Sequence, residues 1–164
     1  MDSLLAMFRT TTKILNISLA GLSDDTSRVR TRMSEGPSIT WTVGHLLDAR
    51  VKILALLGDV HTNPWTESFG DTPATDGQGY PTLTIMLAEW TQLHDALELA
   101  ATKSADAIDR PLAAGGAHGE SKLRDQLAFL AWHEGYHVGV IGAARKAAGL
   151  PGPAELVRAA SRAA

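Results

Sequence analysis

The chain has 164 residues, of which 45% are hydrophobic and 20% are charged, and its formal net charge is −3. These values indicate one soluble globular domain over residues 1–164, with no broad basic surface for nucleic acid. Because the sequence contains no cysteine, disulfides and protein thiolate ligands or nucleophiles are excluded.

Apolar side chains recur at three- and four-residue spacing in four segments, which predicts four amphipathic helices. The predicted helices are residues 3–22, 39–57, 82–103 and 121–148. Glycine or proline residues lie at an end of each segment, as is common where helices begin or stop. A short helix at 154–162 is expected within the tail, residues 149–164. Four such helices in one small domain predict an all-α fold, a four-helix bundle.

The connection over residues 58–81 is long, and it carries three aromatic residues, Trp65, Phe69 and Tyr80, among several prolines and glycines. A long loop anchored by aromatic side chains can form the rim or lid of a pocket. It can equally be a surface crossover whose aromatic side chains pack on the helices. Both interpretations remain open.

His133, Glu134 and His137 form an H-E-x-x-H string in the last predicted helix. Two histidines four residues apart lie on one helical face, so both can bind one metal ion. The string is typical of zinc proteases, in which the glutamate is the general base. However, Val140 replaces the glycine of the longer protease motif, no histidine follows, and Glu155 is the only later acidic residue. We therefore reject a protease, leaving a different metal site or two core histidines with hydrogen-bond partners.

His45 lies near the start of the second predicted helix, and its stripe continues through Ile53 and Leu56, so it should point inward. Inward histidines from two helices can meet in a bundle core. His45 lies ~10 Å from its helix start, and the other pair lies roughly 18–24 Å from theirs. If the two helices are parallel, they must begin at different heights in the bundle for the three histidines to meet. Three neutral imidazoles, from His45, His133 and His137, would leave one position open on a catalytic zinc, nickel or iron(II) ion.

Two stretches of the chain resemble motifs of one family. Residues 38–47, SITWTVGHLL, followed by Arg50, resemble the second-helix motif of the DinB/YfiT-like metalloenzymes. Residues 133–142, HEGYHVGVIG, resemble their fourth-helix motif, H-x-x-x-H-x-G-Q. The resemblance covers nearly the whole chain and implies a four-helix bundle with His45, His133 and His137 as metal ligands. Val140 replaces the usual glutamine of the motif, which removes a hydrogen-bonding amide near the expected metal.

The resemblance also implies partners and an activity. Characterised branches of the family include thiol-dependent transferases and a thiol-dependent isomerase, which use low-molecular-weight thiols such as bacillithiol or mycothiol. The family commonly forms homodimers. A divalent metal, with zinc or nickel favoured over iron, a small-molecule substrate with a thiol cosubstrate, and a homodimer are therefore expected.

Charged residues near the histidines have two interpretations each. Asp48 could accept a hydrogen bond from His45, but an exposed i,i+4 ion pair with Lys52 is favoured. Glu134 would be a fourth ligand or base at the pocket edge, or else a solvated or dimer-facing residue. Arg50 lies on an apolar stripe, so it either binds a substrate anion from a buried position or extends to solvent.

Aromatic residues cluster around the histidines in sequence. Trp41, Trp132 and Tyr136 could line a pocket, and Tyr136 could donate a proton, but core packing is the favoured role for each. His94 is expected on the surface of its helix. The catalytic residues are therefore not determined by the sequence, and Glu134, Tyr136 and Arg50 are only weak candidates.

Three hypotheses about function follow. In the first, the metal lowers the pKa of a cosubstrate thiol, whose thiolate attacks an electrophile, as in an S-transferase; a hydrolase with metal-bound water would use the same ligands. In the second, the protein is a non-catalytic metal- or small-ligand-binding stress protein. In the third, it is a structural bundle without metal. Without a signal peptide or long apolar run, no membrane association and a cytoplasmic location are expected.

Overall fold

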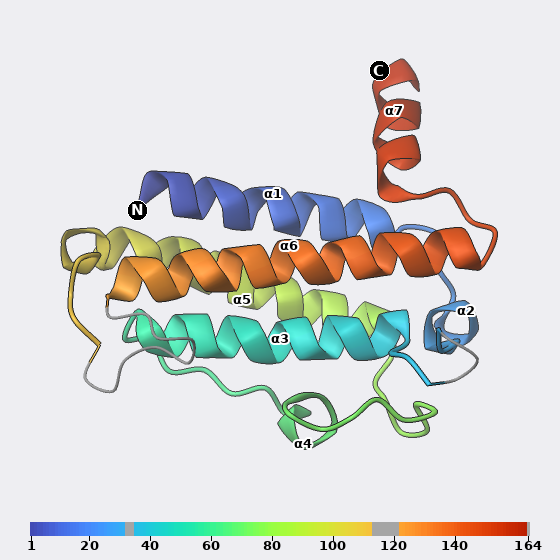
Figure 1. The fold of residues 1–164 in the computed structure, drawn as a ribbon, viewed down its shortest axis with the longest axis horizontal. Coiled ribbons are helices and arrows are strands. Elements are labelled where there is room, and N and C mark those ends of the chain that lie inside the picture. The colour runs from blue at the N-terminus through green and yellow to red at the C-terminus, as the bar shows by residue number, and fades with distance from the viewer. Residues whose placement is uncertain (32–34, 113–121, 164) are drawn as a thin grey trace.

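Four long helices make up most of the structure. The computed structural model describes residues 1–31, 35–112 and 122–163, and these ranges contain helices and turns but no strand. The long helices lie side by side (Figure 1): α1 (Asp2–Leu19), α3 (Ile39–Leu56), α5 (Leu83–Lys103) and α6 (Leu123–Ala147). The all-α fold predicted from the sequence is therefore confirmed. The predicted helix ends agree to within three residues, although residue 121, the predicted start of the last helix, lies outside the described ranges.

Shorter helical elements connect or follow the long helices. They are α2 (Asp24–Arg28), α4 (Thr66–Phe69), the 3-10 turn η2 (Ala105–Ala107) and α7 (Pro153–Ala163). Only α7 was predicted; it contacts α1 but projects away from the four long helices (Figure 1). None of the helices in the described ranges is both long and apolar enough to span a membrane.

The long helices run in two opposite directions. α1 and α6 run one way and α3 and α5 run the other way (Figure 1). α6 packs against α1 and α3, and α5 packs against the same two helices. The helices that carry the three histidines, α3 and α6, are thus antiparallel neighbours, and the parallel arrangement considered from the sequence is wrong. In antiparallel helices the two starts lie at opposite ends of the bundle. The distances of the histidines from their own helix starts therefore do not need to be equal for the side chains to meet.

The start of α3 is fixed by a side-chain cap. The Ser38 hydroxyl accepts a hydrogen bond from the backbone N–H of Trp41 at 3.0 Å, which satisfies one of the free amides at the helix start. The nearby Thr40 hydroxyl lies 2.8 Å from the Ser27 hydroxyl of α2. This cap sets where α3 begins, and it therefore sets the level of His45 along the helix.

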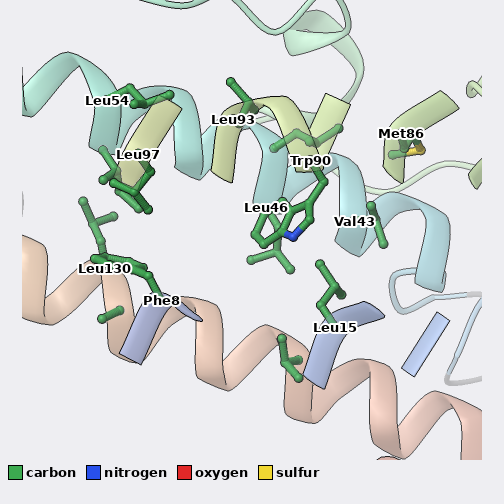
Figure 2. Close-up of a cluster of buried hydrophobic side chains, with 14 of the residues drawn as sticks. Phe8, Leu15, Val43, Leu46, Leu54, Met86, Trp90, Leu93, Leu97 and Leu130 are labelled. Atoms are coloured by element: carbon green, nitrogen blue, oxygen red, sulfur yellow. The ribbon is translucent and has the colours of Figure 1, made fainter. Parts of the chain in front are cut away.

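The hydrophobic core lies between the four long helices (Figure 2). Trp90 of α5 is fully buried at its centre, and side chains from all four helices surround it. The labelled members are Phe8, Leu15, Val43, Leu46, Leu54, Met86, Leu93, Leu97 and Leu130. Complete burial of a large apolar side chain stabilises a fold by roughly 1.5–3 kcal/mol. This core supplies the rigid frame from which the histidines project.

The long loop after α3 is anchored by aromatic residues. Phe69 is fully buried and packs on Tyr80 with ring centroids 4.7 Å apart. Phe69 can approach α3 because residue 44 is glycine: a Cβ atom at Gly44 would lie 2.3 Å from Phe69 Cγ. The close approach brings the backbone of Phe69 and Gly70 next to His45. The loop is therefore packed on the helices and also borders the histidine group.

Candidate metal centre

The structure brings His45 of α3 together with His133 and His137 of α6. His133 Nε2 lies 3.2 Å from His45 Nε2 and 3.1 Å from His137 Nε2. The ligand nitrogens of this group all lie within 4.8 Å of one another, and the three side chains are partly buried. Three imidazole nitrogens from two helices thus converge on one point, which is the donor set of a divalent metal site with an open position.

The second nitrogen of His45 is held by the loop backbone. His45 Nδ1 lies 3.2 Å from the Phe69 carbonyl oxygen and 3.3 Å from the Gly70 carbonyl oxygen. A carbonyl oxygen only accepts, so Nδ1 must carry the proton, and in the neutral ring Nε2 then presents its lone pair to the other histidines. This is the arrangement of a ligating histidine, whose outer nitrogen donates to a backbone carbonyl.

The protonation of the histidines also fits a cation. Burial, together with the nearby His133 and His45 imidazoles, lowers the pKa of His137 to about 3. His137 is therefore neutral at physiological pH, as a metal ligand must be. Without a metal, a single N–H on His133 Nε2 can donate a good hydrogen bond to either His45 Nε2 or His137 Nε2, but not to both. A cation would accept the Nε2 lone pairs of all three histidines. The residues present therefore fit a divalent metal.

Trp41 covers one side of His45. Its ring stacks on the His45 imidazole with centroids 5.1 Å apart and planes only 8° from parallel. Trp41 is partly buried and packs against the core, so it combines the two roles considered from the sequence. The stack holds the imidazole plane in place together with the Nδ1 hydrogen bond.

Asp48 does not bind His45. Its Oδ1 atom accepts hydrogen bonds from Thr66 Oγ1 at 2.7 Å and from Asn63 Nδ2 at 3.3 Å, and its Oδ2 atom pairs with Lys52 at 3.5 Å. The favoured ion pair with Lys52 is therefore present, but the expected exposure is wrong for Asp48, whose side chain is buried. The additional bonds tie the long loop to α3 one turn after His45, so Asp48 helps to hold the loop whose carbonyl oxygens bind that histidine.

Glu134 points away from the three histidines into a fully buried ion pair. Its Oε1 atom accepts from Arg50 Nε, and its Oε2 atom lies 2.8 Å from both Arg50 Nη2 and Thr11 Oγ1. The solvated or dimer-facing position considered for Glu134 is wrong, because the side chain is fully buried. Its carboxylate is not among the converging ligand atoms of the histidine group.

Arg50 is fully buried as well, so its predicted extension to solvent is wrong. The anion that it binds is the carboxylate of Glu134, from the same chain, rather than a free substrate. The guanidinium carbon also lies 4.3 Å from the centroid of the Trp90 ring, a contact that stabilises a cation within an apolar core.

Trp132 and Tyr136 are exposed, so the predicted core packing is wrong for both. Their exposed fractions are 58% and 56%, and their rings stack with centroids 5.9 Å apart. Tyr136 also meets His137 edge-on at 5.0 Å. The residues adjacent to His133 and His137 along α6 therefore form an aromatic surface beside the histidine group.

Several contributors to the site could not be identified from the sequence. The carbonyl groups of Phe69 and Gly70 carry no residue-type signal. Thr12 is a polar residue on the otherwise apolar stripe of α1. This interruption of the stripe was the one sequence feature that indicated a buried polar group facing Thr12. His94, expected on the surface, is partly buried, and its Nδ1 lies 3.3 Å from Arg50 Nη1.

The chain was compared with models of known protein families. The model of the DinB superfamily matches residues 7–141, which is most of the chain. The chain belongs to the DinB superfamily. The match includes the three histidines and ends in α6, so α7 of this DinB protein lies outside it. A search of curated proteins gave no match to the chain.

Proposed function

We propose that this DinB protein is a metal-dependent enzyme that holds one divalent ion with His45, His133 and His137 and acts on a small thiol cosubstrate. The observation that carries the proposal is the convergence of three Nε2 atoms from α3 and α6, with the outer nitrogen of His45 bonded to the loop backbone. Zinc and nickel are the favoured ions, and iron(II) would suit the same nitrogen ligands.

The proposed activity is S-alkylation of the whole thiol: its sulfur forms a bond to the electrophilic carbon, the leaving group departs from that carbon with the bonding electrons, and the thiol proton is lost to water. A bound divalent ion would supply Lewis acidity that lowers the pKa of a thiol. The thiol must come from a cosubstrate because the chain has no cysteine. The three histidines would hold the ion, Trp41 shields one side of His45, and Trp132 and Tyr136 offer an apolar surface to the substrate. We further propose a homodimer, as the family resemblance implies.

One observation favours a second candidate function, a non-catalytic metal- or ligand-binding protein. Glu134, the carboxylate nearest to the ligands in sequence, is committed to Arg50 and Thr11. It therefore cannot serve as a base without breaking a buried ion pair. The same commitment weighs against a hydrolase, in which a nearby base usually activates the metal-bound water.

The first test is metal content. Protein purified without added metal is compared with His45→Ala, with the double variant His133→Ala/His137→Ala, and with His61→Ala, a loop histidine outside the group. We expect about one divalent ion per chain in the parent and in His61→Ala, and loss of the ion in the other two, measured by elemental analysis. A parent that stays metal-free after supplementation would contradict the proposal.

The second test separates the enzyme from the binding protein. The metal-loaded parent is incubated with a low-molecular-weight thiol and an alkylating electrophile, and thioether formation is followed against the metal-free protein. Turnover that requires the metal and is lost in His45→Ala supports the transferase. Stoichiometric metal without turnover above the metal-free control would instead support the non-catalytic function.

A further inference from the structure

A largely buried polar cluster joins all four long helices, and two of its members lie close in sequence to the three histidines. Its members are Thr11 and Thr12 of α1, Arg50 of α3, His94 of α5 and Glu134 of α6. We propose that the Arg50–Glu134 pair at its centre is a positioning element, which fixes α3 against α6 so that the three histidines meet. This inference rests on the proposed metal site and assigns no direct contact with the metal to either residue.

The pair is placed to control the ligands. Arg50 follows His45 by little more than one turn of α3, and Glu134 directly follows His133 in α6. The contact is two-pronged, since Arg50 Nε and Nη2 bond to Oε1 and Oε2 of Glu134, the second at 2.8 Å. A shift of one residue along a helix moves a side chain by about 1.5 Å and turns it by about 100°. A two-pronged contact does not survive such a shift, so it defines one register of α3 against α6.

The apolar core alone would define this register less strictly. Hydrophobic burial has no direction, and aliphatic side chains can repack after a small slide of one helix. A buried ion pair must keep its geometry because separated charges would remain unpaired in an apolar environment. The convergence of His45 on His133 and His137 needs this accuracy, because metal–nitrogen bonds tolerate only a few tenths of an ångström.

Complete burial and its other hydrogen bonds keep Arg50 away from a substrate. Its Nη2 atom lies 3.0 Å from Thr12 Oγ1 and 3.3 Å from the Phe8 carbonyl oxygen, and its Nη1 atom lies 3.3 Å from His94 Nδ1. The side chain is fully buried beneath Trp90 and Phe8. Arg50 therefore binds helices α1, α5 and α6 to α3, which is a positioning role and not a catalytic one.

The test removes the pair while keeping the space filled. The double variant Arg50→Met/Glu134→Leu replaces both charges with apolar side chains, which cores often tolerate without loss of folding. The matched control is Arg145→Met: Arg145 is a buried arginine of α6 that bonds to the carbonyl oxygens of Ser18 and Pro151, away from the histidines. Metal-free proteins are titrated with Co²⁺ in competition with a chelator, and the visible spectrum of bound Co²⁺ and the thermal unfolding of each variant are recorded.

We expect the double variant to unfold cooperatively, to bind Co²⁺ at least tenfold more weakly than the parent, and to show an altered visible spectrum. Arg145→Met should keep the parent affinity and spectrum even where it lowers thermal stability. Parent affinity and spectrum in the double variant would overturn the positioning role. Absence of Co²⁺ binding by the parent would overturn the proposed function itself.

A single substitution covers the case in which the double variant fails to fold. Glu134→Gln keeps the size of the side chain but removes the charge, so the two-pronged contact weakens without a cavity. The expected result is a severalfold loss of Co²⁺ affinity together with an altered spectrum. Unchanged affinity in folded Glu134→Gln would overturn the inference.

Discussion

At the scale of single residues, the histidine site depends on which ring nitrogen carries the proton. The loop carbonyl oxygens hold the proton of His45 on Nδ1, so its Nε2 lone pair already faces His133 and His137. His137 is kept neutral in a different way, because burial and its two histidine neighbours lower its pKa to about 3. Both effects leave a nitrogen lone pair free to bind a metal ion in the metal-free protein. The lowered pKa of His137 also makes the stability of the fold depend on pH.

We predict that acid destabilises the metal-free protein through His137. In the unfolded chain this residue takes up a proton near pH 6.5, but in the folded protein only near pH 3. Between these values the unfolded state binds more protons, so stability falls as the pH is lowered and levels off below about 3. The effect is smaller than the ~1.4 kcal/mol per pH unit of a fully buried site, because His137 is only partly buried.

This is measured by denaturant unfolding of chelator-treated protein at several pH values, for the parent and for His137→Gln. The variant should lose stability less steeply between pH 6.5 and pH 4. Some slope will remain in the variant, because the pKa of His94 is also lowered, first by burial and then by Arg50. Equal slopes for the two proteins would contradict the prediction.

The residues of the histidine group could be named from the sequence, whereas their surroundings could not. His133 and His137 are four residues apart on one helix, which is a local pattern, and His45 was identified from the apolar stripe of its own helix and then supported by the family resemblance. The pairing of Arg50 with Glu134 spans 84 residues of the chain. From its own helix alone, each side chain could be interpreted as an ordinary surface charge. Only the packing of α3 on α6 shows that the two charges neutralise each other.

At the scale of elements, the long loop is part of the site because α4 packs on α3. Phe69 at the end of α4 fills the space beside Gly44, and its carbonyl oxygen then reaches His45. Asp48 adds a second attachment through Thr66, at the start of α4. The loop is therefore held on both sides of the turn that carries His45.

We predict that Gly44→Ala is destabilising by about 1–3 kcal/mol, since the added methyl group would displace Phe69. Metal affinity should fall as well, because the carbonyl oxygens that orient His45 move with Phe69. The control is Gly139→Ala in α6, where a Cβ atom would meet nothing within 4 Å. That change should be neutral or stabilising by roughly 0.5–1 kcal/mol. Thermal unfolding and Co²⁺ titration of both variants check this, and similar behaviour of the two would contradict it.

The sequence predicted the four long helices and α7 well, but it did not predict α2, α4 or η2. An amphipathic stripe is visible only over several turns, as in α1, α3, α5 and α6. The five residues of α2 and the four of α4 are too few to show a period. Their positions are decided by contacts with α3, such as the burial of Phe69 beside Gly44, and contacts of this kind are not encoded in local spacing.

At the scale of the whole molecule, the proposed ligands belong to two antiparallel helices, α3 and α6, which contact each other through the core. A metal ion that binds both helices in the folded state, and only weakly to the unfolded chain, must raise the stability of the entire fold. The gain grows with the logarithm of metal concentration and reaches about 2.7 kcal/mol at one hundred times the Kd.

We therefore predict that Zn²⁺ raises the Tm of the metal-free parent in a concentration-dependent way and that excess chelator reverses the shift. His61→Ala should show the parent shift, whereas His45→Ala should show little or none. Differential scanning calorimetry over a range of Zn²⁺ concentrations measures this. An equal shift in His45→Ala would mean that the ion acts elsewhere on the protein.

The separation of the ligands along the chain has one more consequence. His45 and His133 are 88 residues apart, so an ion shared between them would close a loop of more than half the polypeptide. Closing such a loop restricts the unfolded chain in the way a disulfide does, although this sequence contains no cysteine. The metal would then act as a reversible cross-link whose formation follows the supply of the ion and is independent of the redox state of the cell.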